Sequence, residues 1–211
     1  MQRTEAFKDI QDRIVEARWY WRTWKTLYIG SEKKFELLNR SARSFFGIVE
    51  QVLINHVILG LTKLNDSAKG TVTFKKLLNE QRLLLPQSAL DAAEAVRVEF
   101  ETCIEPLEVW RNKYLAHVDP QYVKGGPKPL PELKLPEIDR AIELAEKFMN
   151  TIGDDMEYSW GIVGELGSAQ VLLHQLLYAD RYCKQNKDAG YRPFDLEADL
   201  AALEWQEDKA R

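Results

Sequence analysis

The chain has 211 residues, a length that favours one domain because single domains commonly hold about 100–200 residues. Charged residues make up 29% and apolar residues 45%, the ordinary balance of a globular protein. The formal charge is −4, from 29 Lys and Arg against 33 Asp and Glu. This excludes a generally cationic surface, so any binding of nucleic acid or anionic lipid has to come from a local basic patch.

The cysteines and the apolar stretches favour a cytoplasmic protein. Cys103 and Cys183 have no CxxC spacing, which excludes a thiolate zinc site and predicts two reduced thiols. The N-terminus is charged and lacks the apolar core of a secretory signal. The most apolar stretch, Val52 to Leu61, falls short of the about 20 residues that a bilayer span needs. We expect it to be a core helix and expect no membrane segment.

Helical periodicity begins near the N-terminus. Apolar residues from Phe7 to Tyr28 recur at spacings of three, four and seven, which predicts a long amphipathic helix ending near Gly30. Ser31 is the predicted cap of the next helix, which should end near Asn65.

The second helix is the most apolar and carries two stripes. One stripe is formed by Leu38, Ala42, Phe45, Val49, Val52, His56 and Leu59, and the other by Phe46, Leu53, Val57, Leu61 and Leu64. Two apolar stripes predict a helix buried on two sides. It is either central in the bundle or shared between the bundle and a partner subunit.

The remaining segments also predict helices. In chain order they are a short helix over 73–85, a long helix capped by Ser88 and ending at 119–120, a helix from Pro136 to about Asn150, a long helix after 167–168 and a short one after Asp195. Pro106 predicts a kink or break in the long helix. Residues 119–136, with five prolines and two glycines, predict a long loop.

No segment alternates with period two, so the fold class is all-α. We predict an antiparallel bundle of four to five long helices with short accessory helices. It forms a single domain over 1–211, with a core at about 31–185 and a C-terminal extension over 186–211.

The three histidines are where acid–base chemistry is sought first. His56 and His174 lie among leucines and valines, which favours buried neutral histidines over catalytic ones. No Cys or carboxylate stands at ligand spacing from either, so neither a metal nor another cofactor is expected.

His117 stands at a helix end, close to Arg111, Asn112 and Asp119. The negative end of the helix dipole and Asp119 both favour an imidazolium. A charged donor fork beside a titratable group suits a phosphodiester. In an ideal α-helix Arg111 and His117 lie about 9 Å apart along the axis and roughly 120° apart around it. They meet only if the last turn unwinds or a second copy completes the site; otherwise Arg111 is an ion-pair residue and His117 a cap.

The segment from Arg111 to Asp119 reads Arg-Asn-Lys-Tyr-Leu-Ala-His-Val-Asp and resembles the R-x(4–6)-H signature of the HEPN superfamily. Asn112 stands where members usually have a polar residue. The residues of this segment are most similar to those of the abortive-infection (AbiU-like) branch. Further features typical of that branch are Phe45-Phe46, Leu61-x-x-Leu64-x-Asp66 and a short helix with Leu77-Leu78. The resemblance covers roughly residues 35–185.

This resemblance implies a homodimer whose two motifs face each other and cleave RNA without a metal. The RNA 2′-OH would be the nucleophile, which restricts the substrate to RNA. The implied roles are general base or acid for His117, transition-state charge stabilisation for Arg111 and orientation of the phosphate or the histidine for Asn112. Such proteins act in phage defence or as toxins, with an antitoxin or nucleotidyltransferase as a possible partner. The alternative is a non-catalytic dimeric module that binds a partner protein or a nucleotide.

Four further residues are possible supporting members of the site: Asp66, Lys113, Tyr114 and Asp119. Tyr114 continues the stripe of Trp110, which favours a core position, and it lies inside the motif, so the tyrosine modified in some family toxins is not carried over. Asp66 is equally explained by turn capping. Trp19 is only loosely available for base stacking.

Overall fold

The computed structural model describes residues 4–66, 68, 70–115, 129–153 and 169–185, without the side chains of Cys183 and Gln185. All regular structure in these ranges is helical: six α-helices and one π-helical turn. The predicted all-α fold class is confirmed.

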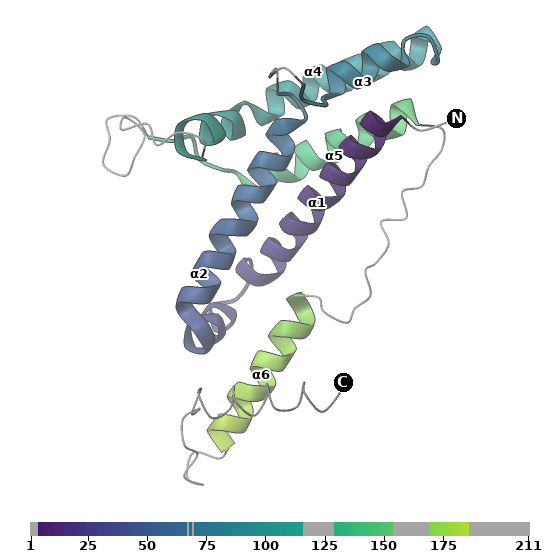
Figure 1. Cartoon of the computed structure of the whole chain (residues 1–211). Coiled ribbons are helices and arrows are strands. Elements are labelled where there is room, and N and C mark those ends of the chain that lie inside the picture. Colours follow the sequence, from purple (N-terminus) through teal and green to yellow (C-terminus); the bar gives the residue numbers. More distant parts are fainter. Residues whose placement is uncertain (1–3, 67, 69, 116–128, 154–168, 186–211) are drawn as a thin grey trace, which may run out of the picture.

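Helices α1 (Glu5–Tyr28) and α2 (Glu32–Lys63) form a long antiparallel pair (Figure 1). Thr4 caps α1, its hydroxyl accepting a hydrogen bond from the amide of Phe7. Gly30 lies between the helices at φ +142°, a conformation that side-chain-bearing residues rarely adopt. The predicted end of the first helix near Gly30 is therefore confirmed, and glycine is needed there.

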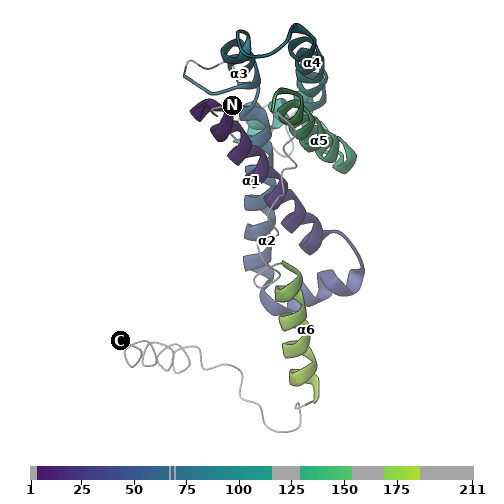
Figure 2. The same cartoon turned by 90° about the vertical axis from the view of Figure 1, so that its right-hand side faces the viewer.

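Helix α2 is bent at Ala42, whose backbone is extended (φ −165°, ψ 73°). Figure 2 shows the N-terminal stretch of α2 turned away from the axis of the rest. The Tyr28 hydroxyl donates a 2.6 Å hydrogen bond to the Phe46 carbonyl across this end of the bundle. The sequence predicts one continuous helix because no proline or glycine marks the bend.

Helices α3 (Phe74–Gln81), α4 (Gln87–Trp110) and α5 (Leu135–Ile152) pack at the other end of the α1–α2 pair. Three buried rings join them: Phe74 lies 4.0 Å from Phe148 and 5.0 Å from Phe100 between ring centroids. Helix α1 supplies buried residues to the same cluster, among them Phe7 and Trp21. The core therefore begins before residue 31, the start that the sequence predicts.

Two predictions for α4 are wrong in detail. The helix begins at Gln87 after Pro86, so Ser88 lies inside the first turn and is not the cap. It also continues through Pro106 to Trp110 without a break. Ile104 and Leu107, on either side of this proline, are buried in the core, and their packing holds the helix together despite the missing backbone donor.

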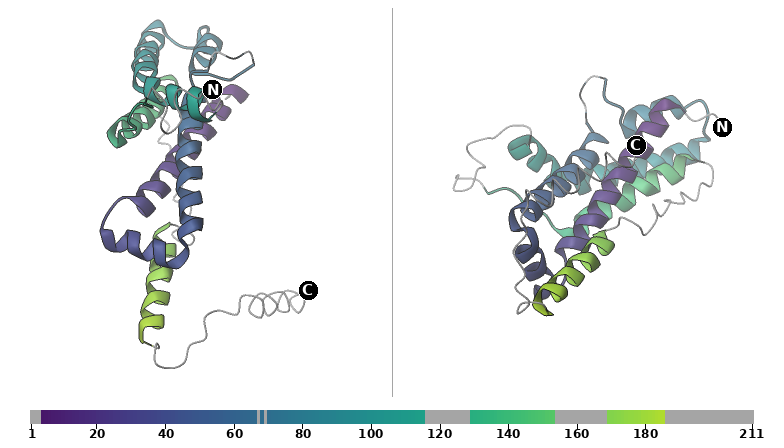
Figure 3. Two further views of the ribbon diagram at one scale, coloured as in Figure 1. Left: turned by 90° about the vertical axis from the view of Figure 1, so that its left-hand side faces the viewer. Right: turned by 60° about the horizontal axis from the view of Figure 1, so that its bottom comes forward.

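Helix α6 (Ala169–Gln185) lies against α1 and α2 near their connecting turn (Figures 1 and 3). Its partly buried Ala169, Leu173 and Leu176 complete a second apolar cluster with five buried residues, namely Leu27, Tyr28, Leu38, Phe46 and Leu53. The predicted start of α5 at a proline is confirmed, since Pro136 lies in its first turn. The tail over 186–211 lies outside the described residues.

One helix of the described chain, α2, is long and apolar enough to meet the length and composition criteria of a membrane span, and 28% of its most apolar 18-residue stretch is buried. A single such helix is weak evidence for a membrane protein, because core helices pass the same test.

Candidate functional site

The arginine of the sequence motif lies in an unusual turn. Helix α4 ends at Trp110, and the next five residues form the π-helical turn η1 (Arg111–Leu115), where the sequence predicts continued α-helix. Hydrogen bonds in a π-turn run from i to i+5, and such turns are frequent at functional sites. Trp110 anchors the turn, because its indole nitrogen donates a 2.7 Å hydrogen bond to the carbonyl of Pro131.

The Arg111 guanidinium lies against the C-terminal end of α2. Its Nη1 is 3.5 Å from the carbonyl oxygen of Thr62 and 3.7 Å from a carboxylate oxygen of Asp66. Both distances are long for a hydrogen bond, and 19% of the side chain is exposed. The structure therefore brings together two predicted site residues, Arg111 and Asp66, and leaves part of the guanidinium exposed, where an anion could reach it.

Asn112 positions the arginine. Its side-chain oxygen accepts a 2.9 Å hydrogen bond from Nε of Arg111. This bond fixes the edge of the guanidinium nearest the backbone, while the Nη atoms point toward α2. The polar residue after the arginine thus orients its neighbour.

Asp66 acts both as a turn cap and as a partner of the arginine, so both interpretations of it hold. One carboxylate oxygen accepts a 3.0 Å hydrogen bond from the amide of Ala68, which stabilises the turn after α2. The other faces Arg111. The adjacent Asn65 donates a 3.2 Å hydrogen bond to Glu108 of α4, so the turn is tied to the helix that carries Arg111.

The remaining motif residues are placed differently. Tyr114 contacts Trp110 edge-on, with 5.4 Å between ring centroids, but 38% of it is exposed; the predicted core position is wrong. Lys113 is half-buried in η1. His117 and Asp119 lie outside the described residues, so their approach to Arg111 stays a prediction.

The other two histidines are exposed, so their predicted burial is wrong. His56 has its Nδ1 2.9 Å from the carbonyl of Val52 on its own helix, and its ring lies edge-on to Tyr20. His174 is exposed on α6. Trp19 is 57% exposed and stacks on Tyr20.

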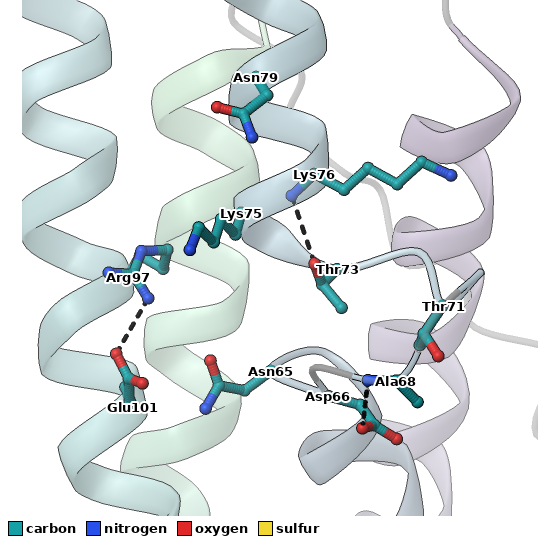
Figure 4. A pocket seen from close by; sticks show the side chains of 10 residues that line it. All are labelled: Asn65, Asp66, Ala68, Thr71, Thr73, Lys75, Lys76, Asn79, Arg97 and Glu101. Carbon is teal, nitrogen blue, oxygen red and sulfur yellow. Dashed lines mark hydrogen bonds and ion pairs between the residues drawn. The ribbon is translucent and has the colours of Figure 1, made fainter.

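A polar pocket of about 480 Å³ lies directly beside Asp66, and no sequence pattern predicted it. We call it the elbow pocket. It is lined from the turn after α2, the first half of α3 and one face of α4 by Asn65, Asp66, Ala68, Thr71, Thr73, Lys75, Lys76, Asn79, Arg97 and Glu101 (Figure 4). The available signal was the pair Lys75-Lys76 directly after the helix cap Thr73.

Among the described residues, no group of three or more His, Cys, Asp or Glu side chains is arranged to hold a metal ion. The Arg111 site carries one guanidinium beside one carboxylate, and the elbow pocket carries three cationic side chains beside two carboxylates. What the arrangement favours chemically is the binding of anions.

A helical bundle in which an arginine and its polar neighbour stand at the end of a long helix, beside an acidic turn, is the arrangement of a HEPN-type domain. The AbiU2 family model of HEPN domains matches residues 4–170, well over half of the chain. The protein belongs to this family and is an abortive-infection-related HEPN domain. Neither a curated protein nor a solved structure matches the chain. The matched span includes α1 and every candidate site residue.

Proposed function

We propose that this protein is a metal-independent endoribonuclease that acts in phage defence or as the toxin of a toxin–antitoxin pair. The observation that carries the proposal is the partly exposed Arg111, oriented by Asn112 and Asp66 in a π-helical turn that leads into His117. A guanidinium held by long contacts is available to a phosphate, and the residue types fit phosphoryl transfer.

The reaction follows from these residues. The RNA 2′-oxygen bonds to phosphorus, the bond to the 5′-oxygen breaks, and the products are a 2′,3′-cyclic phosphate and a 5′-hydroxyl. The proton leaves the 2′-OH and reaches the 5′-oxygen through His117 and solvent. Arg111 stabilises the charge that develops on the phosphate oxygens. DNA lacks the nucleophile and is not a substrate.

The π-helical turn changes the angle that is expected between Arg111 and His117 around the helix axis. In a π-turn the rotation per residue is smaller than in an α-helix, because the hydrogen-bonded ring holds one more residue. The observed winding of Arg111–Leu115 therefore departs from the ideal geometry that separates Arg111 from His117 by roughly 120°. Six residues at this smaller rotation do not bring the two side chains onto one face, so their meeting depends on the chain after Leu115 or on a second copy.

We further propose that the active form is a homodimer assembled on α2. Of its two predicted apolar stripes, one is buried, whereas the other exposes Phe45 by 58% and Val52 by 46%; the neighbouring Ile48, which the predicted stripe did not include, is 64% exposed. We call these three residues the α2 stripe. Their spacing of three and four places them on one helix face, and large exposed apolar faces mark interaction sites. A second copy presents the same stripe, as a two-fold interface requires.

A dimer would also raise the positive potential at the site where RNA binds. The protein carries a net charge of −4, so one arginine meets the polyanion against an unfavourable field. Two Arg111–His117 sets facing each other double the local positive potential. The cytoplasm, where RNA and phage genomes are found, is the compartment that this function requires.

The test compares His117→Ala with His174→Ala, a matched control because His174 is an exposed histidine on another helix. Purified wild-type protein should cut single-stranded RNA in the presence of EDTA, leaving cyclic phosphate ends. His117→Ala should lose a factor of about 10²–10⁴, the usual contribution of general acid–base catalysis, whereas His174→Ala should cut normally. Equal cleavage by both variants would reject the proposal.

A second candidate, a non-catalytic module that binds a partner protein or nucleotide, is favoured by the α2 stripe, which fits a partner helix as well as a second copy. Expression in cells separates the two. Growth arrest that disappears with His117→Ala supports the toxin, and co-purification of an antitoxin or a nucleotidyltransferase would identify its partner. Absence of arrest together with a stable partner complex supports the binding module.

A further inference from the structure

The elbow pocket adjoins the Arg111 site, and the two share Asp66. One carboxylate oxygen of Asp66 faces Arg111, while the residue also lines the pocket together with α3 and α4. A polymer bound at Arg111 therefore has to pass only Asp66 to enter the pocket. Figure 4 shows how the walls come from three segments, with Asp66 and Asn65 at one end and Asn79 at the other.

The carboxylates of the pocket are already engaged. Asp66 accepts from the amide of Ala68, and Glu101 accepts a 2.9 Å hydrogen bond from Arg97. Arg97 is also held by both carboxylate oxygens of Glu94, at 2.8 and 2.9 Å. These acidic groups and Arg97 therefore already have partners. The remaining side chains decide which ligand charge the pocket favours.

Those remaining side chains are donors. Lys75 and Lys76 form no ion pair within the described part of the chain, and Thr71 and Asn79 add neutral donors. Figure 4 shows Lys75 directed toward Arg97 and Lys76 extending to the other side of α3. The charge of Lys75 reaches the neighbouring carboxylate too, since it contributes, after Arg97, to lowering the pKa of Glu94.

Both lysines are exposed and lie at the end of α3 that disfavours cations. They lie in the first turn of α3, which contains no acidic residue, and the positive end of a helix dipole repels cations. An anion in the pocket would interact favourably with Lys75 and the helix end together. The cavity volume of about 480 Å³ accommodates more than a single ion.

We propose that the elbow pocket binds a backbone phosphate of the RNA strand, neighbouring the phosphate held by Arg111. The inference rests on the proposed ribonuclease function and deepens it, since it gives the strand a path from η1 past Asp66 onto α3. Lys75 and Lys76 are then binding residues that set substrate affinity and take no part in the bond-making step.

The experiment measures binding of a 2′-O-methyl RNA, which cannot be cleaved, by fluorescence anisotropy over a range of salt concentrations. Lys75→Gln/Lys76→Gln should bind about tenfold more weakly, and its salt dependence should fall by about 0.7 for each phosphate that the lysines no longer neutralise. The control Arg22→Gln/Lys33→Gln removes two exposed cations at the opposite end of the α1–α2 pair and should bind like wild type. Equal affinity and salt slope in both variants would overturn the inference.

Cleavage separates this inference from the function on which it rests. With cleavable RNA, Lys75→Gln/Lys76→Gln should raise KM and leave kcat unchanged, and its melting temperature should equal or exceed that of wild type. If neither wild-type protein nor any variant cleaves RNA, but Lys75→Gln/Lys76→Gln binds RNA more weakly than wild type, the ribonuclease proposal fails and the proposed phosphate site in the pocket is supported. If 5′-AMP or inorganic phosphate stabilises the protein while RNA affinity is unaffected by the substitutions, the pocket holds a free phosphate and the RNA inference fails.

Discussion

The α2 stripe gives the sharpest test of the proposed dimer, through the substitution Ile48→Glu. Ile48 is 64% exposed. Full burial of an isoleucine stabilises by about 1.5–3 kcal/mol, so covering the exposed part contributes about 1–2 kcal/mol. A two-fold interface contains the residue twice, which makes about 2–4 kcal/mol for the dimer. Glutamate removes this contribution and adds the cost of desolvating two carboxylates.

The expected result is a dimer dissociation constant raised by at least about 30-fold, because each 1.4 kcal/mol is a factor of ten. The folded protomer should be affected little, since substitutions at exposed positions usually change stability by less than about 0.5 kcal/mol. Sedimentation equilibrium measures the dissociation constant, and thermal unfolding at a concentration where both proteins are monomeric checks the fold.

The matched control is Val98→Glu, an exposed apolar residue of α4 that lies outside the α2 stripe and is 49% accessible. It should leave the dissociation constant unchanged. The reasoning is refuted if wild-type protein is monomeric at high micromolar concentration. It is equally refuted if Ile48→Glu and Val98→Glu weaken the dimer to the same extent, because the interface then lies elsewhere.

Three further outcomes are expected. Arg111→Ala should lower kcat by about 100-fold or more but shift the melting temperature by only a few degrees, since a partly exposed ion pair contributes about 0–1 kcal/mol; unfolding of the variant would instead indicate a structural arginine. Burial raises the pKa of Tyr28 to about 12, so the stability from its neutral hydroxyl is present below pH 10 and lost as the pH rises through 12. Urea unfolding of Tyr28→Phe should lack that loss. Phe148→Ala should destabilise by about 3–5 kcal/mol, measured by urea unfolding, because it removes a fully buried ring stacked on Phe74.

Helix positions could be predicted from periodicity because burial of one helix face repeats every three to four residues. The end of α1 followed from Gly30, and the start of α3 agrees with the helix expected from residue 73, but α3 ends at Gln81 and not at the expected residue 85. The bend at Ala42 was not predicted, because neither proline nor glycine stands there; beside it the Ser41 hydroxyl donates to the carbonyl of Leu37, and the Tyr28–Phe46 hydrogen bond joins α2 to α1 beyond the bend.

The sequence also does not determine which face of an apolar helix is buried. Periodicity marks both stripes of α2 as apolar but does not say which of them the bundle covers. His56 was expected to be buried for this reason, and it lies on the exposed side. Accessibility in the folded chain shows which apolar residues of α2 the bundle leaves exposed, and their coverage by a partner stays a prediction.

The candidate site was predictable only in part. Arg111 and Asn112 follow from a local motif, and Asp66 from its place after an apolar helix. The pairing of Arg111 with Thr62 and Asp66 requires α2 and α4 to be in place. The elbow pocket depends on three segments at once, and no linear spacing in the sequence encodes such a meeting.

The π-helical turn bears on how this motif tolerates change in length. A turn that accommodates one extra residue absorbs an insertion locally, so the helix before it keeps its register with the rest of the bundle. Such a turn is compatible with the variable spacing of the R-x(4–6)-H signature. The number of residues between arginine and histidine therefore does not fix the distance between their side chains. The activity of a variant with one residue deleted after Leu115 would measure how far this segment tolerates a change in length.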